Sequence, residues 1–249
     1  MNDKIIGRQP VLEALKARQP IDKILLQHGT HGPVISAIFK LAKQSGVPTA
    51  EASKQRFREL VGDEPAQGAI AFVSEARYVE LDDLLAIAAQ RHQPPFLLIL
   101  DEIEDPHNLG ALIRTADCAG VHGVVIPKHH SATVNQTVVK TSAGAVAHLA
   151  IARVTNIANT IDELKEKNVR VVGVETSGSV SLYEADLTGP IALVIGNEGR
   201  GIRRLVKEKC DALVRIPMFG KLNSLNASVS GGLMMFEVAR KRIENLSKT

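Results

Sequence analysis

Three segments of the sequence place polar side chains of catalytic type beside apolar runs. The segment DEIEDPHNLGALIRTADCAGV (101–121) holds an amide and a guanidinium, at Asn108 and Arg114. The segment IALVIGNEGRG (191–201) ends an apolar run with a carboxylate, at Glu198. The segment RIPMFGKLNSLNASVSGG (215–232) crowds small polar residues ahead of a further apolar stretch, at Asn223, Ser224, Asn226, Ser228 and Ser230. Together these groups could bind a phosphate or hydroxyl and move a proton.

The first of these segments predicts a helix. Asp105 with Pro106, or Asn108, can start it. At about 100° per residue the apolar side chains form one stripe, at Leu109, Leu112, Ile113 and Ala116. Gly110 and Arg114 lie one turn apart, away from that stripe, so the glycine is expected to leave open space beside the guanidinium. The arginine is aimed at a phosphate or hydroxyl, or it is an ordinary exposed helix residue.

The other two segments indicate a ligand site. The glycine order at Gly196, Gly199 and Gly201 is neither the dinucleotide fingerprint nor a P-loop, which disfavours a nucleotide-dependent dehydrogenase. Bare backbone amides could still cradle a ligand there, although a simple tight turn is an equal alternative. In the third segment, five polar side chains exceed what one helix start requires for capping.

The apolar runs predict the fold class. From residue 96 onward the expected strands are nearly continuous apolar stretches, at 96–100, 123–126, 148–154, 169–175, 191–196 and 212–217. Strands buried on both faces have this composition, so we expect an α/β fold with a mostly parallel sheet and helices on both faces. In such sheets ligands bind beyond the carboxyl ends of the strands, where each polar segment lies. Residues 1–75 predict a separate small α/β domain, 76–95 a linker or helix, and 96–249 the large domain.

The amino-acid composition favours some binding partners and kinds of site and disfavours others. The 249 residues include no Trp and only 3% aromatics, which disfavours aromatic stacking on single strands. Two distant cysteines and eight histidines without metal-ligand spacing predict neither a disulfide framework nor a metal site. No secretory signal or membrane-spanning run is visible, so we expect a cytoplasmic protein. Residues 199–249 carry 11 Lys and Arg against 4 Asp and Glu, which favours a polyanion such as RNA, or merely a solvated basic helix face.

Taken together, the motifs resemble those of the SpoU (TrmH) family of RNA ribose 2'-O-methyltransferases. The resemblance covers residues 96–243 and rests on N-x-G-x-x-x-R-T-A at 108–116, G-N-E-G-x-G at 196–201, and I-P-M with S-L-N-A-S-V-S at 216–230. Residues 1–75 are similar to the small RNA-binding domain of bacterial 23S rRNA guanosine 2'-O-methyltransferases, through I-I-G-R-Q-P-V-L-E-A-L and Ala66-Gln67-Gly68.

This resemblance implies a SPOUT-type α/β knot in the carboxyl-terminal segment, S-adenosylmethionine as the cofactor, and a homodimer with the active site at its interface. It implies catalytic roles for Asn108, Arg114, Glu198, Ser224, Asn226 and Ser228. It implies cofactor binding by Thr176, Gly178, Gly196, Asn197, Ile216, Met218 and Leu225. The expected substrate is a guanosine of 23S rRNA in the peptidyl-transferase P-site loop. The alternatives are methylation of tRNA and a non-catalytic RNA-binding protein on the same fold.

The residues suggest how the roles divide. Arginine stays protonated and offers no acceptor, so we expect Arg114 to hold the target phosphate while Glu198 or a phosphate oxygen receives the proton. Gly196 is expected to let the ligand approach closely. Three arginines after the glycine motif are expected to face RNA, at Arg200, Arg203 and Arg204.

Overall fold

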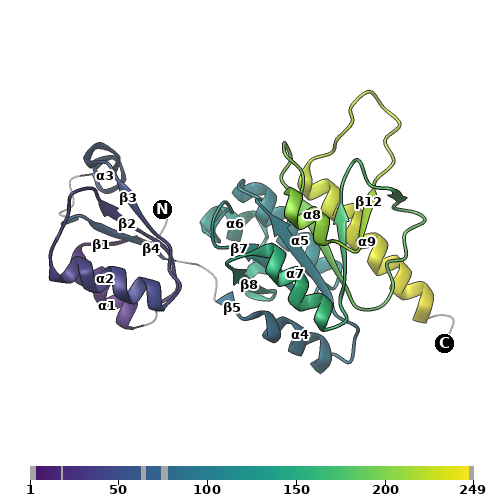
Figure 1. Cartoon of the computed structure of the whole chain (residues 1–249), viewed down its shortest axis with the longest axis horizontal. Helices are drawn as coiled ribbons and strands as arrows, with labels where there is room; N and C mark the ends of the chain where they lie inside the picture. The colour runs from purple at the N-terminus through teal and green to yellow at the C-terminus, as the bar shows by residue number, and fades with distance from the viewer. Residues whose placement is uncertain (1–3, 18, 63–65, 74–77, 247–249) are drawn as a thin grey trace. The chain divides into compact units, whose positions relative to one another are not determined.

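The computed structural model describes residues 4–17, 19–62, 66–73 and 78–246, which form two compact units (Figure 1). The first unit is Met1–Ala76 and the second is Arg77–Thr249. The helix after this boundary, α4 (Leu81–Gln90), packs its buried Leu81 and Leu84 into the core of the second unit. It is therefore part of the large unit and not a free linker.

The first unit is a four-stranded sheet with helices. Its strand order is β1-β4-β2-β3, in which β2 and β3 are parallel and the other pairs antiparallel. Aliphatic side chains of the first two helices pack on one part of the sheet, and Phe57 of the third helix packs with Ile70 and Phe72. Its elements are β1 (Lys4–Ile6), α1 (Arg8–Lys16), β2 (Ile21–Gln27), α2 (Pro33–Gln44), β3 (Thr49–Ala52), α3 (Lys54–Val61) and β4 (Ala69–Val73).

The second unit is built on an eight-stranded parallel sheet, which confirms the fold class. The strand order is β10-β12-β9-β11-β6-β7-β8-β5, and every pairing between neighbours is parallel. The strands are β5 (Tyr78–Val79), β6 (Phe96–Asp101), β7 (Gly123–Pro127), β8 (Ala150–Val154), β9 (Arg170–Val174), β10 (Val180–Ser181), β11 (Ile191–Gly196) and β12 (Ala212–Arg215). The two-residue edge strands β5 and β10 carry no apolar run and were not expected.

Helices cover both faces of this sheet. The helices are α5 (Pro106–Cys118), α6 (Gln136–Thr141), the 3-10 turn η1 (Ala145–Ala147), α7 (Ile157–Glu166), α8 (Arg204–Lys209) and α9 (Ala227–Leu246). Apolar side chains of α4, α7 and α8 share one core with Leu97, Ile99 and Val194. On the other face, Gly231 of α9 lies against Leu112 of α5 and Ile195 of β11. All residues of β6 and β11 are buried because both faces of the sheet are covered.

The central strands end at one edge of the sheet. Gly196 of β11 is in register with Asp101 of β6, and β9 and β12 follow on the other side of β11. The loops after these four strands therefore meet, as expected for a parallel sheet.

The carboxyl-terminal knot stays a prediction. Within the described residues, no helix is long and apolar enough to cross a membrane.

Candidate active site

Helix α5 brings Asn108 to the carboxyl edge of the sheet. Asp105 caps the helix by accepting a hydrogen bond from the backbone nitrogen of His107 at 3.0 Å, and Pro106 is the first helical residue. All four residues of the expected apolar stripe are fully buried, at Leu109, Leu112, Ile113 and Ala116. Because this stripe fixes the helix on the sheet, Asn108 is held at the helix start, only 8% exposed.

Glu198 is the centre of a polar cluster from three distant segments. Its Oε1 accepts hydrogen bonds from Asn108 Nδ2 at 2.7 Å, from Asn226 Nδ2, and from the backbone nitrogen of Ala227 at 3.3 Å. Asn226 Nδ2 also donates to Asn108 Oδ1 at 3.0 Å. The carboxylate sits at the first residue of the long helix α9, where the positive end of the helix dipole favours a negative charge. Within the described part of the chain, Glu198 Oε2 has no hydrogen-bond partner, so it can accept one from a substrate.

Asn226 joins this cluster to the start of α9. Its Oδ1 accepts hydrogen bonds from the backbone nitrogens of Ser228 at 2.9 Å and Val229 at 3.4 Å, and from the Ser228 hydroxyl. The side chain thus caps the helix with its oxygen and holds Asn108 and Glu198 with its nitrogen. Within the described residues, the hydrogen bonds that join Ser228 to the cluster run to this asparagine.

A cavity of about 390 Å³ opens beside Glu198, at the ends of β9, β11 and β12. Six of the seven expected cofactor residues line it, and so do two of the expected catalytic residues: Thr176, Gly196, Asn197, Ile216, Met218 and Leu225, with Glu198 and Ser224. Its size falls within the range of small-molecule sites, roughly 300–1,000 Å³. The lining combines aliphatic side chains, suited to a purine ring, with strand-end backbone groups and a carboxylate, suited to the polar parts of S-adenosylmethionine.

Two glycines of the site are required by the chain itself. Gly178 does not line the cavity; a Cβ there would lie 2.7 Å from the backbone nitrogen of Arg215. At Gly196 a Cβ would lie 2.3 Å from the backbone nitrogen of Ile202. The returning loop fills the side of Gly196 where a Cβ would stand, while Gly196 also lines the cavity, so its close approach to a ligand stays a prediction.

The space beside Gly110 is also filled. A Cβ at Gly110 would lie 2.6 Å from Thr141 Cβ and 3.1 Å from the backbone oxygen of Val138. The expected open space next to Arg114 is thus wrong, because α6 packs against α5 there.

Arg114 itself is exposed and makes no hydrogen bond or ion pair with the residues that the structure describes. It lies six positions after Asn108, which at about 100° per residue turns the two side chains to different sides of α5. One chain alone therefore brings together Asn108, Glu198 and Asn226 but does not add Arg114 from the same side of the helix.

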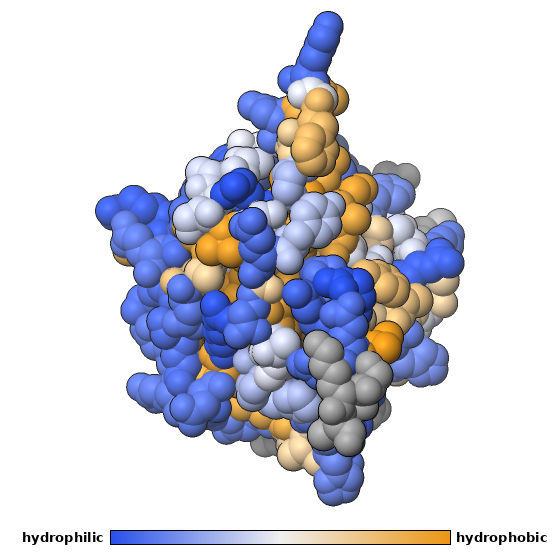
Figure 2. All heavy atoms as spheres, turned by 90° about the vertical axis from the view of Figure 1, so that its right-hand side faces the viewer, coloured by the Kyte–Doolittle hydropathy of each residue, from blue (hydrophilic) through white to orange (hydrophobic). Residues whose placement is uncertain are grey.

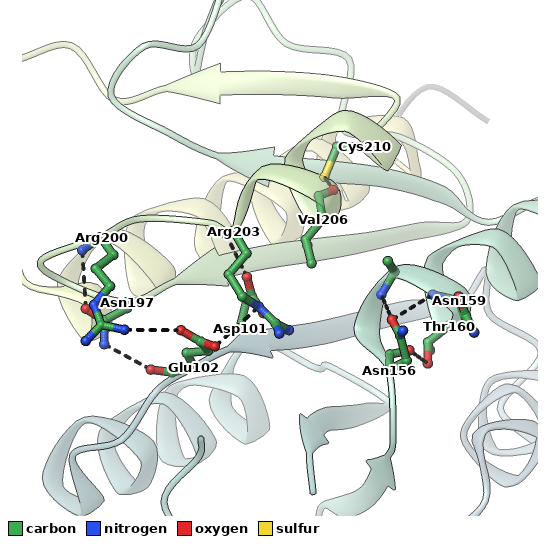
Figure 3. A network of polar contacts seen from close by, with 11 residues as sticks. Asp101, Glu102, Asn156, Asn159, Thr160, Asn197, Arg200, Arg203, Val206 and Cys210 are labelled. Carbon is green, nitrogen blue, oxygen red and sulfur yellow. Dashed lines mark hydrogen bonds and ion pairs between the residues drawn. The ribbon is translucent and has the colours of Figure 1, made fainter. Parts of the chain in front are cut away.

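The arginines after the glycine motif divide into two kinds. Figure 3 shows Arg203 turned toward Asp101, whose Oδ1 accepts hydrogen bonds from Arg203 Nε at 2.8 Å and Nη2 at 2.6 Å. This buried carboxylate holds Arg203 and raises the pKa of its guanidinium further, while the side chain stays 44% exposed, so contact of Arg203 with RNA stays a prediction. Arg200 and Arg204 are largely exposed and available to a polyanion.

Sequence reasoning missed Asp101 and Glu102. Asp101 is the last residue of the apolar strand β6 and Glu102 follows it, and a carboxylate at the end of a strand buried on both faces was the available signal. Glu102 also has a backbone φ of 60°, which a sequence pattern does not reveal for a residue other than glycine. Among the described residues, no group of three His, Cys, Asp or Glu side chains could hold a metal ion.

Two family models match the chain. The model of the SpoU rRNA Methylase family matches residues 95–236, and a model described as RNA 2'-O ribose methyltransferase substrate binding matches residues 4–79. YacO of Bacillus subtilis, assigned to the TrmH family of tRNA/rRNA methyltransferases, is 45% identical over 241 residues, which cover 97% of this chain and 96% of YacO.

Solved structures agree. An rRNA methyltransferase from Sinorhizobium meliloti with bound AdoMet is 27% identical, with a TM-score of 0.58 over 96% of this chain and 87% of that one. AviRb from Streptomyces viridochromogenes, a SpoU methyltransferase in complex with AdoMet, has the same fold, with a TM-score of 0.62 over 97% of this chain and 90% of AviRb at 24% identity. The chain belongs to the SpoU (TrmH) family of RNA methyltransferases, which use S-adenosylmethionine as the methyl donor.

Proposed function

We propose that this protein methylates the ribose 2'-hydroxyl of a guanosine in the peptidyl-transferase P-site loop of 23S rRNA. The observation that carries the proposal is the carboxylate of Glu198. Asn108 and Asn226 hold one of its oxygens, and the other, which has no hydrogen-bond partner among the described residues, lies beside a cavity that suits S-adenosylmethionine. The match of residues 4–79 to a ribose methyltransferase substrate-binding model supports the ribose as the acceptor.

The chemistry needs placement and a proton acceptor. When bound, S-adenosylmethionine supplies a methyl group on a sulfonium, so the carbon–sulfur bond breaks as a carbon–oxygen bond forms and a neutral thioether leaves. The ribose hydroxyl loses its proton, which Glu198 Oε2 accepts. Backbone and aliphatic groups that line the cavity hold the methyl donor in line with the ribose 2'-oxygen. This placement lowers the barrier because it orients the two reactants.

Arg114 is the proposed partner of the target phosphate. Its guanidinium has no acceptor, so it cannot take the proton, but it can bind a phosphate oxygen with two parallel hydrogen bonds. Since it lies on a different side of α5 from Asn108, we propose that it completes the site of a second copy of the chain.

An apolar stripe on α9 supports this homodimer. Four large side chains at intervals of three, four or seven residues are 45–67% exposed, at Val229, Leu233, Phe236 and Ile243. The face of the molecule in Figure 2 shows hydrophobic residues at the surface between hydrophilic ones. Exposed apolar stripes of this kind mark interaction surfaces.

Methylation assays on purified RNA test the substrate. Unmodified 23S rRNA and unmodified tRNA would each be incubated with the protein and S-adenosylmethionine carrying a tritiated methyl group. The proposal predicts transfer to 23S rRNA and loss of one P-site-loop methylation in rRNA from a deletion strain. Transfer to tRNA alone would establish the tRNA alternative, and binding of RNA without transfer would establish a non-catalytic RNA-binding protein.

We expect the reaction to take place in the cytoplasm, where rRNA is found.

A further inference from the structure

We infer that Asp101 and Glu102, the last residue of β6 and the one after it, are positioning residues for Glu198. They anchor both ends of the loop 197–203 that carries this carboxylate (Figure 3). The inference rests on the proposed role of Glu198 and adds to it a device that fixes where the carboxylate lies.

Asp101 anchors the far end of the loop. The residue is fully buried, and its Oδ1 binds the guanidinium of Arg203 at 2.6 and 2.8 Å while its Oδ2 accepts the backbone nitrogen of Arg203 at 2.8 Å. One carboxylate thus holds the side chain and the main chain of the same residue. Charge-assisted bonds to a buried carboxylate are short and directional, so they fix the position and orientation of Arg203.

Glu102 anchors the near end through its backbone. Its φ of 60° lies in the left-handed region, which residues other than glycine seldom adopt, and its carbonyl oxygen accepts Asn197 Nδ2 at 3.0 Å. Asn197 Oδ1 in turn accepts the backbone nitrogens of Gly199 at 2.9 Å and Arg200 at 3.3 Å. An uncommon backbone conformation next to a catalytic loop indicates a local constraint that the fold maintains.

Glu198 lies between these two anchors. Its hydrogen-bond partner Asn108 comes from the segment of chain that follows Asp101 and Glu102. Asn108 stands on α5, which begins at Pro106, four residues after Glu102. The end of β6 therefore fixes the loop that carries the carboxylate and the helix that carries its hydrogen-bond donor. Displacing Asp101 would change the distance between Glu198 and Asn108 without touching either residue.

A double-mutant cycle tests the inference. The full-length variants Asp101→Asn, Glu198→Gln and the double variant would be compared by single-turnover methyl transfer to RNA and by binding of S-adenosylmethionine. We expect Asp101→Asn to slow transfer on the order of 100-fold, the loss that a misplacement of about 1 Å can cause. In the Glu198→Gln background the same change should slow it less than about threefold, since no carboxylate remains to be positioned.

Matched variants separate positioning from general damage. Asp211 offers the control, because its carboxylate accepts the backbone nitrogen of Val171 at 2.8 Å and pairs with Lys165, beyond the opposite end of α8. Asp211→Asn should lower stability and leave transfer unchanged. Arg203→Lys, which keeps the backbone bond to Asp101, serves if Asp101→Asn does not fold, and should show the same dependence on Glu198.

The outcomes are distinct. Equal losses from Asp101→Asn in both backgrounds, or no loss in either, would overturn the inference while leaving the proposed function intact. Full activity of Glu198→Gln would overturn the proposed role of Glu198, and the inference with it.

Discussion

Asn108 Nδ2 donates a hydrogen bond of 2.7 Å to Glu198 Oε1, across 90 residues of chain. The contact forms because β6 and β11 are neighbours in the parallel sheet and end in register, so the loop after one meets the helix after the other. Asn226 then bonds both residues from the start of α9. Three segments that are remote in sequence thus build one carboxylate site beside a cavity.

Asn226 has two functions that mutation should separate. Asn226→Ser keeps an oxygen for the helix cap and removes the amide donor, so stability should stay within a few tenths of a kcal/mol while turnover falls about 100-fold. Asn226→Ala removes both and should also lower the free energy of unfolding by about 1 kcal/mol. Urea unfolding and methyl-transfer rates measure the two effects. Equal turnover of Asn226→Ser and wild type would contradict the role in the cluster.

Gly110 should not tolerate a side chain. Gly110→Ala would press a methyl group onto Thr141 and the backbone of Val138, and overpacking of this kind costs about 1–3 kcal/mol. Gly232 is the matched control, since its nearest neighbour would be Thr115 Cγ2 at 3.6 Å, an ordinary contact. Gly232→Ala should stabilise the helix by up to about 1 kcal/mol. If both variants unfold at the same urea concentration, the packing of α6 on α5 is wrong.

His122 should make stability depend on pH. It is buried, and its Nδ1 accepts the backbone nitrogen of Phe96 at 2.9 Å. Burial, followed by the charges of Arg242 and Arg91, lowers the pKa of His122 from 6.5 to about 4. The unfolded chain therefore takes up a proton near pH 6.5, and the folded chain does so only near pH 4. Stability from this group is present above pH 6.5 and is lost as pH falls toward 4, by up to about 3 kcal/mol.

The variant His122→Gln isolates this effect. Its free energy of unfolding, measured from pH 7.5 to pH 4, should fall less steeply than that of the wild type. Carboxylates titrate in both proteins and cancel in the difference. Parallel curves would show that His122 does not titrate as the structure predicts.

Arg114 should act on turnover more than on RNA binding. Arg114→Lys keeps a positive charge but loses the paired donors, so RNA affinity should persist while turnover falls on the order of 100-fold. Arg114→Ala and Glu198→Gln chains, each strongly impaired alone, should regain activity when co-assembled if one copy supplies the arginine and the other the carboxylate. Leu233→Lys, on the apolar stripe of α9, should yield monomers in sedimentation and no activity. Co-assembled chains that stay inactive would contradict a shared site.

The sequence predicted the large elements of the second unit because their signals are strong. Apolar runs gave the six main strands, and the segment after Asp105 gave α5 with its buried stripe. The edge strands β5 and β10 were not predicted, because a strand of two residues has no periodicity in its sequence. The packing of α6 against Gly110 was not predicted either. Helix geometry shows which side of the helix a residue faces, but not which neighbour fills the space there.

The site was predicted unevenly for a similar reason. Strand-end placement brought Asn108, Glu198 and Asn226 to one edge, as the motifs indicated. The anchoring roles of Asp101 and Arg203 depend on an ion pair between a buried carboxylate and a partly exposed guanidinium 102 positions apart, and a single sequence does not show which charges pair.

The chemical identity of the methylated nucleoside tests the proposed methylation of a guanosine ribose most directly. RNA modified by the protein would be digested to nucleosides and analysed by mass spectrometry, alongside RNA treated with the Glu198→Gln variant. We expect 2'-O-methylguanosine from the wild type and at least a tenfold smaller yield from the variant. A methyl group on a base, or an equal yield from both proteins, would contradict it.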